Sequence, residues 1–346
     1  MARAGQPRRL PRSGRAARDA HRADRRANAR HRGPDVASTE TPPGPELGVG
    51  LLTNQEPDVY EALARRLDEA GLDVLSVYND LRYQPAIGPL LLAARVTERL
   101  RLGPAALNPF TVHPYEIAGQ IATLDLVSRG RAYLGLAKGA WLDQVGVEET
   151  EPLRGLREAV EVVEQLLSGD ETGVAGTRFR LAPGTTLAYR RERARVPLMI
   201  GSWGRRTIEW AGTVADEVKV GGTANPDIVP LVRAWLGGGS RTRVVVGCVS
   251  VVDEDADWAR ERVRAAVAPY LEIVARRDPT LGLRPGQEPP LDRFAIAGTP
   301  DEVAARVRSL WDAGADRVEL GTPQGRTTPA GVDLICDRVV PLLRDG

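Results

Sequence analysis

Two glycine-rich segments of this chain carry residue types that could bind a flat, anionic ligand. The segment GLAKGAWLD (135–143) follows an apolar run; its glycines let the backbone approach a planar ring, which its tryptophan could cover. The segment IGSWGRRTIEWAG (200–212) leads into a helical pattern, with Ser202 at the predicted N-cap and Arg205 and Arg206 beside free amides. Helix amides and guanidinium groups bind anions, so a phosphate could dock there. Both segments are also compatible with ordinary strand-to-helix loops.

A third segment, LGPAALNPFTVHP (102–114), places small residues between two prolines at the end of an apolar run. It could hold a backbone bulge against a ring system, or it could be a simple turn into the next helix. Its His113 is the one histidine after residue 45, so a Ser-His-Asp triad would have to use it, and no G-x-S-x-G motif accompanies it. A hydrolase is therefore disfavoured.

Motifs for nucleotide and metal sites are also missing. No G-x-G-x-x-G follows an early strand, and no G-x-x-x-x-G-K-[ST] occurs, so neither a Rossmann nor a Walker site is supported. Cys248 and Cys336 are the two cysteines, and both lie among apolar residues, which excludes a cysteine-rich metal site. We predict no metal site.

The segments that could do chemistry must be positioned by the elements between them, and strand and helix patterns alternate from Glu46 onward. This alternation indicates a parallel sheet, and eight such units in about 300 residues favour a closed (β/α)8 TIM barrel, an α/β fold, over an open doubly wound sheet. The eight predicted strands are 46–52, 73–78, 101–107, 131–137, 196–201, 217–222, 242–252 and 316–321.

Three further segments interrupt this cycle. The apolar run 294–298 could be a ninth strand or a connection. Residues 170–195 and 278–293 are rich in Gly, Pro and Arg, and we expect them to be insertions at the carboxyl-terminal rim of the barrel, where such folds carry their active sites.

The first 45 residues differ in composition from the rest of the chain. Residues 1–45 contain eleven arginines and four acidic residues, with very few large aliphatic side chains. So little apolar surface cannot offset the entropy of ordering, so we predict a disordered basic tail before a barrel domain at 46–346. Two alternatives are a translation start placed upstream of the real one and a polyanion-binding arm, although no aromatic residues are interleaved for stacking.

The pairing of NPFTVHP with GRAYLGLAKG, continued by VPLMIGSWGRR, resembles the bacterial luciferase-like superfamily over residues 46–345. The resemblance is closer to its F420-dependent oxidoreductase branch, which includes methylenetetrahydromethanopterin reductase. It implies a barrel, usually dimeric, that holds the deazaflavin coenzyme F420, or alternatively FMN, with its ring over the strand ends.

The resemblance also implies roles for individual residues. Asp80 would contact the polar edge of the ring, and Ala105 and Ala106 match a non-prolyl cis peptide that supports the ring from behind. Four side chains near the strand ends could donate a proton, Tyr78, Tyr83, His113 and Asp80, and of these Asp80 and His113 are the predicted catalytic residues. The implied cofactor-binding residues are Asn79, Asp80, Ala105, Ala106, Asn108, Lys138, Gly139, Ala140, Trp141, Asp143, Ser202, Trp203, Gly204, Arg205 and Arg206.

The chain departs from the family pattern at two positions. Sugar-phosphate and alcohol dehydrogenases of this branch carry a His after the matching Asp and a Glu in the loop after the fourth strand, where this chain has Leu81 and Ala140. Those groups transfer protons during alcohol oxidation. We therefore expect hydride transfer between F420 and a small organic substrate, as a reductase more than as an alcohol dehydrogenase.

Two other functions remain open: an FMN-dependent monooxygenase of a two-component system, and a non-catalytic deazaflavin- or flavin-binding protein. The folded part is mildly acidic, no apolar run approaches the length of a membrane span, and no hydrophobic stretch follows Arg8 and Arg9. We expect a cytoplasmic protein, a homodimer by resemblance, that binds neither nucleic acid nor membrane.

Overall fold

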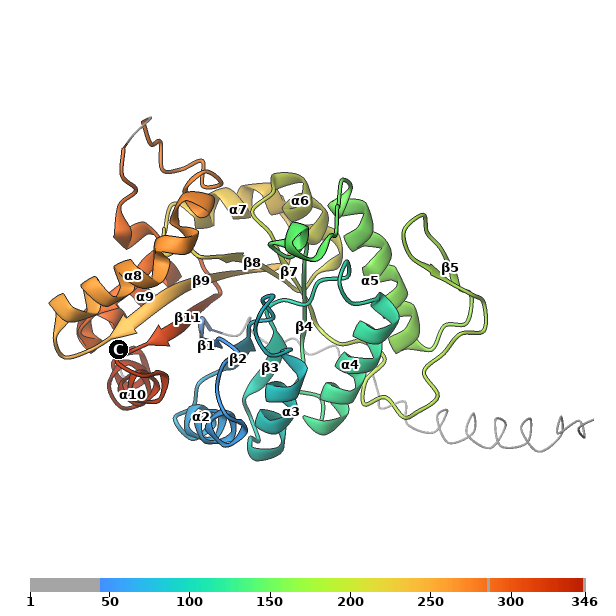
Figure 1. The fold of residues 1–346 in the computed structure, drawn as a ribbon, viewed down its shortest axis with the longest axis horizontal. Helices are drawn as coiled ribbons and strands as arrows, with labels where there is room; N and C mark the ends of the chain where they lie inside the picture. The colour runs from blue at the N-terminus through green and yellow to red at the C-terminus, as the bar shows by residue number, and fades with distance from the viewer. Residues whose placement is uncertain (1–43, 285–286, 345–346) are drawn as a thin grey trace, which may run out of the picture. The chain divides into compact units, whose positions relative to one another are not determined.

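The computed structural model describes residues 44–284 and 287–344 (Figure 1). The predicted tail 1–45 lies outside the described residues, apart from Gly44 and Pro45. The strands are β1 (Glu46–Leu51), β2 (Val74–Val77), β3 (Arg101–Pro104), β4 (Leu134–Ala137), β5 (Val174–Ala175), β6 (Arg180–Leu181), β7 (Leu198–Gly201), β8 (Glu217–Gly221), β9 (Arg243–Val252), β10 (Ala295–Gly298) and β11 (Arg317–Gln324).

Eight of these strands form the predicted parallel barrel. They run in the order β3-β2-β1-β11-β9-β8-β7-β4, and all paired neighbours on this path are parallel. Two isolated parallel bridges, Leu102 to Ala132 and Leu107 to Leu136, join β3 to β4 and close the ring. The prediction of a closed (β/α)8 barrel is therefore confirmed.

The helices surround the strands, as Figure 1 shows. They are α2 (Pro57–Glu69), α3 (Ile87–Val96), α4 (Pro114–Val127), α5 (Pro152–Ser168), α6 (Arg205–Val214), α7 (Ile228–Leu236), α8 (Ala256–Ala275), α9 (Pro300–Asp312), α10 (Thr328–Leu334) and α11 (Val340–Arg344). Proline stands in the first turn of several helices, where its missing N–H costs nothing. Among the described residues, no helix is long and apolar enough to cross a membrane.

The segments that interrupt the cycle take different positions. Residues 294–298 include β10, which pairs in parallel with the outer half of β9 and stands off the barrel path. The described part of 278–293 lies over the end of β8, because Arg293 binds Asn225 and Asp227 in the following loop.

Residues 170–195 reach the rim only with the tip of their β5–β6 hairpin. Arg178 stacks over Phe110, and Phe179 contacts His113 edge-on. The rest of the segment descends along the outer side of the barrel, where Tyr189 binds the backbone of α4. Figure 1 draws the hairpin outside α5.

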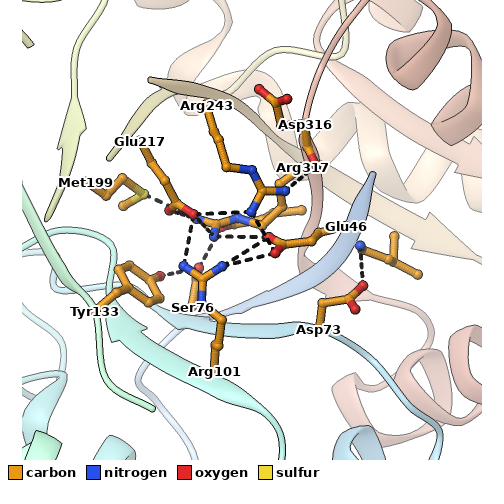
Figure 2. A network of polar contacts seen from close by, with 12 residues as sticks. Glu46, Asp73, Ser76, Arg101, Tyr133, Met199, Glu217, Arg243, Asp316 and Arg317 are labelled. Carbon is orange, nitrogen blue, oxygen red and sulfur yellow. Dashed lines mark hydrogen bonds and ion pairs between the residues drawn. The ribbon is translucent and has the colours of Figure 1, made fainter. Parts of the chain in front are cut away.

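The interior of the barrel near its amino-terminal end is filled by a network of charged side chains (Figure 2). Arg317 is fully buried and pairs with Glu217 and Glu319. Arg101 joins Glu217 to Glu46. Each carboxylate of this network, on Glu46, Glu217 and Glu319, has a cationic partner, and these paired side chains occupy this end of the barrel.

Candidate active site

Inward-facing glycines make room inside the barrel for large side chains. A Cβ built on such a glycine would clash with the side chain that crosses it, at 2.5 to 3.0 Å from the nearest atom. The pairs are Gly48 with Glu319, Gly103 with Tyr133, and Gly247 with Lys219. The glycines therefore determine which side chains can cross the interior.

At the carboxyl-terminal mouth, one glycine has no such neighbour. A Cβ on Gly221, which follows Glu217 and Lys219 on the inward face of β8, would meet no heavy atom within 4 Å. On the neighbouring strand, the space above Gly201 is bounded by the methyl group of Ala137 at 3.3 Å. The mouth therefore has an open floor of small residues over β4, β7 and β8.

The peptide bond between Ala105 and Ala106, just after β3, is cis. This is the backbone geometry that the family resemblance implies at these residues. Ala105 packs on the barrel interior beside Tyr133. The cis bond therefore lies at the edge of the open floor, although its role toward a cofactor stays a prediction.

Asn108 joins the loop after β3 to the loop after β4. Its buried side chain accepts hydrogen bonds from the N–H groups of Phe110 and Thr111, at 2.8 and 3.2 Å. A Cβ on Gly139 would lie 2.4 Å from its Nδ2, and Gly139 has a φ of 82°, which favours glycine. The structure brings these two predicted residues together.

Asp80 lies half-buried at the mouth, after β2. Burial raises the pKa of its carboxyl group, and the ammonium group of Lys219 partly opposes this shift. Its neighbour Asn79 accepts a hydrogen bond from the N–H of Ala86 at 2.9 Å, at the start of α3. Asn79 thus supports the loop, while Asp80 is free of hydrogen bonds through its carboxylate within the described part of the chain.

The loop after β4 extends toward the opposite wall. Trp141 has left-handed backbone geometry and packs against Tyr270 of α8, with ring centroids 5.9 Å apart. Arg82 of the β2 loop binds Gln144 of the same loop at 3.0 Å. Lys138, Ala140 and Asp143 are exposed beside them.

The segment after β7 has the expected chemistry but a different cap. The prediction that Ser202 is the N-cap of the helix is wrong: α6 begins at Arg205, with Gly204 at the N-cap. The Ser202 hydroxyl instead accepts a hydrogen bond from the Gly204 N–H at 3.0 Å. The Trp203 indole donates to the carbonyl of Gly221 at 2.9 Å and so fixes this loop to β8.

The two arginines of this segment differ. Arg205 binds Glu209 one turn further along the helix at 2.7 Å. Arg206 is exposed, and among the described residues it has no ion-pair partner. Arg206 is therefore the more available of the two for an external anion.

His113 stands apart from the other predicted residues. It is exposed at the N-cap of α4, where its Nδ1 accepts a hydrogen bond from the N–H of Tyr115 at 3.1 Å. Its ring also contacts Phe179 of the hairpin edge-on. These contacts support a role of His113 in capping the helix. A catalytic role for His113 stays a prediction, and no contact with Asp80 within the described residues supports it.

Sequence analysis assigned no role to three residues at or below the mouth. Lys219 projects inward from β8 and binds Glu319 of β11, and both side chains are buried. Tyr270 comes from α8, and burial together with the charges of Asp80 and Tyr83 raises its pKa. Two charged residues, Glu217 and Lys219, in the otherwise apolar strand β8 were the available sequence signal.

The family model for luciferase-like monooxygenases matches residues 36–317. The chain belongs to this family. Within the described residues, no group of three or more His, Cys, Asp or Glu side chains is arranged to hold a metal ion.

Several relatives are similar over nearly their whole length. The chain is 27% identical to the 5,10-methylenetetrahydromethanopterin reductase of Methanopyrus kandleri, over 86% of this chain and 99% of that protein. It is 29% identical to the F420-dependent glucose-6-phosphate dehydrogenase of Kineococcus radiotolerans, over 87% and 98%. The solved structure of the coenzyme F420-dependent tetrahydromethanopterin reductase from Methanopyrus kandleri matches with a TM-score of 0.76, 26% identity, and coverage of 87% and 100%.

Proposed function

We propose that this protein is an F420-dependent oxidoreductase that transfers a hydride between the deazaflavin and a small organic substrate. The observation that carries the proposal is the open floor over β4, β7 and β8, bordered by the cis bond at Ala105 and Ala106. A planar ring fits a surface without large side chains, and the F420-dependent relatives match this chain over 87% of its length.

The residues at the mouth fit the parts of this cofactor. The ring would lie over Gly201 and Gly221, with its polar edge toward Asp80. The phosphate would meet the first amides of α6 and Arg206, since a helix N-terminus favours an anion. Lys138, Gly139 and Trp141 would line the ring and its side chain from the loop after β4.

The bound cofactor supplies two electrons and a hydrogen as hydride, and the protein has to orient the partners and exclude water. Trp141 and Tyr270 pack against each other, with ring centroids 5.9 Å apart, and we infer that this pair would help to exclude water from the bound ring. Leu81 and Ala140 provide no proton-transferring group where alcohol dehydrogenases of this family have one. We therefore infer a reductase rather than an alcohol dehydrogenase.

The test is a titration of the purified protein with F420 and, separately, with FMN. We expect saturable quenching of F420 fluorescence and much weaker binding of FMN. Preferential binding of FMN would favour the monooxygenase that gives the family its name, and binding of neither would contradict the proposal. Bound F420 without turnover of any acceptor would indicate the non-catalytic alternative.

The proposal includes a cytoplasmic homodimer that binds a small molecule and no nucleic acid. The dimer rests on the family resemblance, and the absence of nucleic-acid binding rests on the mildly acidic composition after residue 45. Light scattering of the purified protein tests the dimer directly. A monomer that still binds F420 would remove the dimer from the proposal and leave the activity in place.

A further inference from the structure

The side chain of Tyr78 fills the half of the mouth that faces the open floor. A Cβ built on Gly50 of β1 would lie 2.2 Å from the Tyr78 hydroxyl oxygen, and one on Gly321 of β11 would lie 2.4 Å from it. The phenol therefore extends from the end of β2 across β1 to β11. In the strand order of the barrel, β1 stands opposite β7, which carries Gly201 of the open floor.

The Tyr78 hydroxyl is a free donor. Within residues 44–284 and 287–344 it has no hydrogen-bond partner, whereas the buried hydroxyl of Tyr133 is 2.6 Å from Ser76 Oγ. Tyr78 keeps part of its surface exposed at the mouth. Burial, followed by the charge of Glu319, holds the pKa of Tyr78 well above its ordinary value, so the phenol keeps its proton. A neutral O–H at this position can donate to a ligand.

A cation lies close to the ring of this phenol. The Lys219 ammonium nitrogen lies 5.4 Å from the centre of the Tyr78 ring. Lys219 also interacts electrostatically with the carboxyl group of Asp80, and the ion pairs inside the barrel connect three carboxylates with four cations. They are Glu46, Glu217, Glu319, Arg101, Arg243, Arg317 and Lys219.

We propose that the substrate is a conjugated carbonyl compound whose oxygen accepts a hydrogen bond from the Tyr78 hydroxyl. The inference rests on the proposed F420-dependent reduction. A ring over the open floor presents its free face toward the opposite wall, where Tyr78 lies, so the acceptor fits between them.

The reaction balances with the reduced deazaflavin as the two-electron donor. The β-carbon of the acceptor gains the hydride and forms a new C–H bond. The C=C electron pair moves toward the carbonyl oxygen, which becomes an enolate held by the Tyr78 O–H above the Lys219 charge. Water then supplies the proton to the α-carbon, and the hydroxide left behind takes up the proton that the cofactor loses from its ring nitrogen, which gives the saturated carbonyl compound and the oxidised cofactor.

The experiment uses the F420-loaded protein with 2-cyclohexen-1-one as the probe, and follows formation of oxidised F420 by absorbance. We expect Tyr78→Phe to lower kcat/KM about 100-fold, as for loss of one donor to a developing oxyanion, with an unchanged Kd for F420. Gly50→Ala keeps the hydroxyl but displaces it, since the three atoms nearest to the new methyl group would all belong to Tyr78, and it should lower kcat/KM as well. Tyr189→Phe, whose hydroxyl binds the Gly119 carbonyl on α4, is the matched control and should behave like the wild type.

A second measurement separates hydrogen bonding from a purely structural role. Cyclohexanone labelled with ¹³C at the carbonyl should show a downfield shift when bound to the oxidised holoenzyme, and Tyr78→Phe should abolish that shift. Three outcomes would overturn the inference and leave F420 binding intact. They are unchanged turnover of the enone by Tyr78→Phe, a bound carbonyl signal that is the same in Tyr78→Phe and the wild type, and F420-loaded protein that binds neither ketone. Failure to bind F420 would overturn both proposals.

Discussion

The two ends of the barrel interior use the same strands for opposite purposes. Near the amino-terminal end, Arg317 and Glu217 are buried and form an ion pair, so the charges there are paired with one another (Figure 2). At the mouth, Asp80 and Tyr78 have no hydrogen-bond partners for their side chains within the described residues, and Gly221 leaves open space. Glu217 belongs to the paired end and Gly221 to the open mouth, although the two residues are only four positions apart on β8.

This difference shows how one parallel barrel can combine stability with binding. The paired end has nothing left to offer a ligand, because each charge already has its partner. The mouth has unused donors, an unpaired carboxylate and empty volume, which are the features that a ligand can complete. Variants at the two ends should therefore have separable effects on stability and on cofactor affinity.

The largest effect is expected from breaking the paired end. Arg317→Met removes a fully buried guanidinium group and leaves Glu217 and Glu319 without it. We expect a loss of about 3–5 kcal/mol in the free energy of unfolding, measured by urea denaturation. The exposed pair of Arg276 and Glu272 offers the matched control, because Arg276→Gln should change stability by about 0.5 kcal/mol or less. Equal losses in the two variants would contradict the comparison.

A smaller effect, on binding alone, is expected from filling the open end. Gly221→Val places a side chain where a Cβ meets no heavy atom within 4 Å, so the fold should accept it. We expect the Kd for F420 to rise about 10-fold or more, which corresponds to roughly 1.4 kcal/mol. The measurement is fluorescence titration beside a urea curve. Gly88→Ala, also at a position with open space but on α3, is the control and should leave the affinity unchanged; wild-type affinity in Gly221→Val would place the ring elsewhere.

The smallest effect is expected from Asp80→Asn, through pH. Because burial raises the pKa of Asp80, the native protein keeps this proton to a higher pH than the unfolded chain does. The free energy of unfolding therefore falls as pH rises from the pKa of Asp80 in the unfolded chain, about 3.9, to its raised pKa in the native protein. Above this pH range the loss of stability remains constant.

Asp80→Asn should thus be slightly more stable than the wild type at neutral pH, with the difference vanishing below the unfolded pKa. Thermal unfolding across this pH range measures it, and Asp143→Asn, at an exposed position after β4, is the matched control. A variant that loses stability at neutral pH would mean that the carboxylate is ionised and paired in the native protein.

Much of the architecture could be predicted, because it depends on local patterns. The alternation of apolar runs and helical periodicity gave the eight barrel strands within a few residues, and the segments around Ala105 and Gly139 lie at strand ends as expected. The N-cap of α6 could not be predicted from the sequence. Ser202 and Gly204 are both residue types that favour the N-cap position, and only the backbone geometry distinguishes them.

The sequence by itself determined the barrel and the segments that form its rim, since strand and helix periods are properties of neighbouring residues. Only the tertiary structure decided that Lys219 lies beneath Tyr78, and that Tyr270 reaches Trp141. Strands buried on both faces read as continuous apolar runs, so the inward positions leave little pattern. Contacts across the mouth depend on how the ring of strands closes, and this closure joins residues that are far apart in the chain.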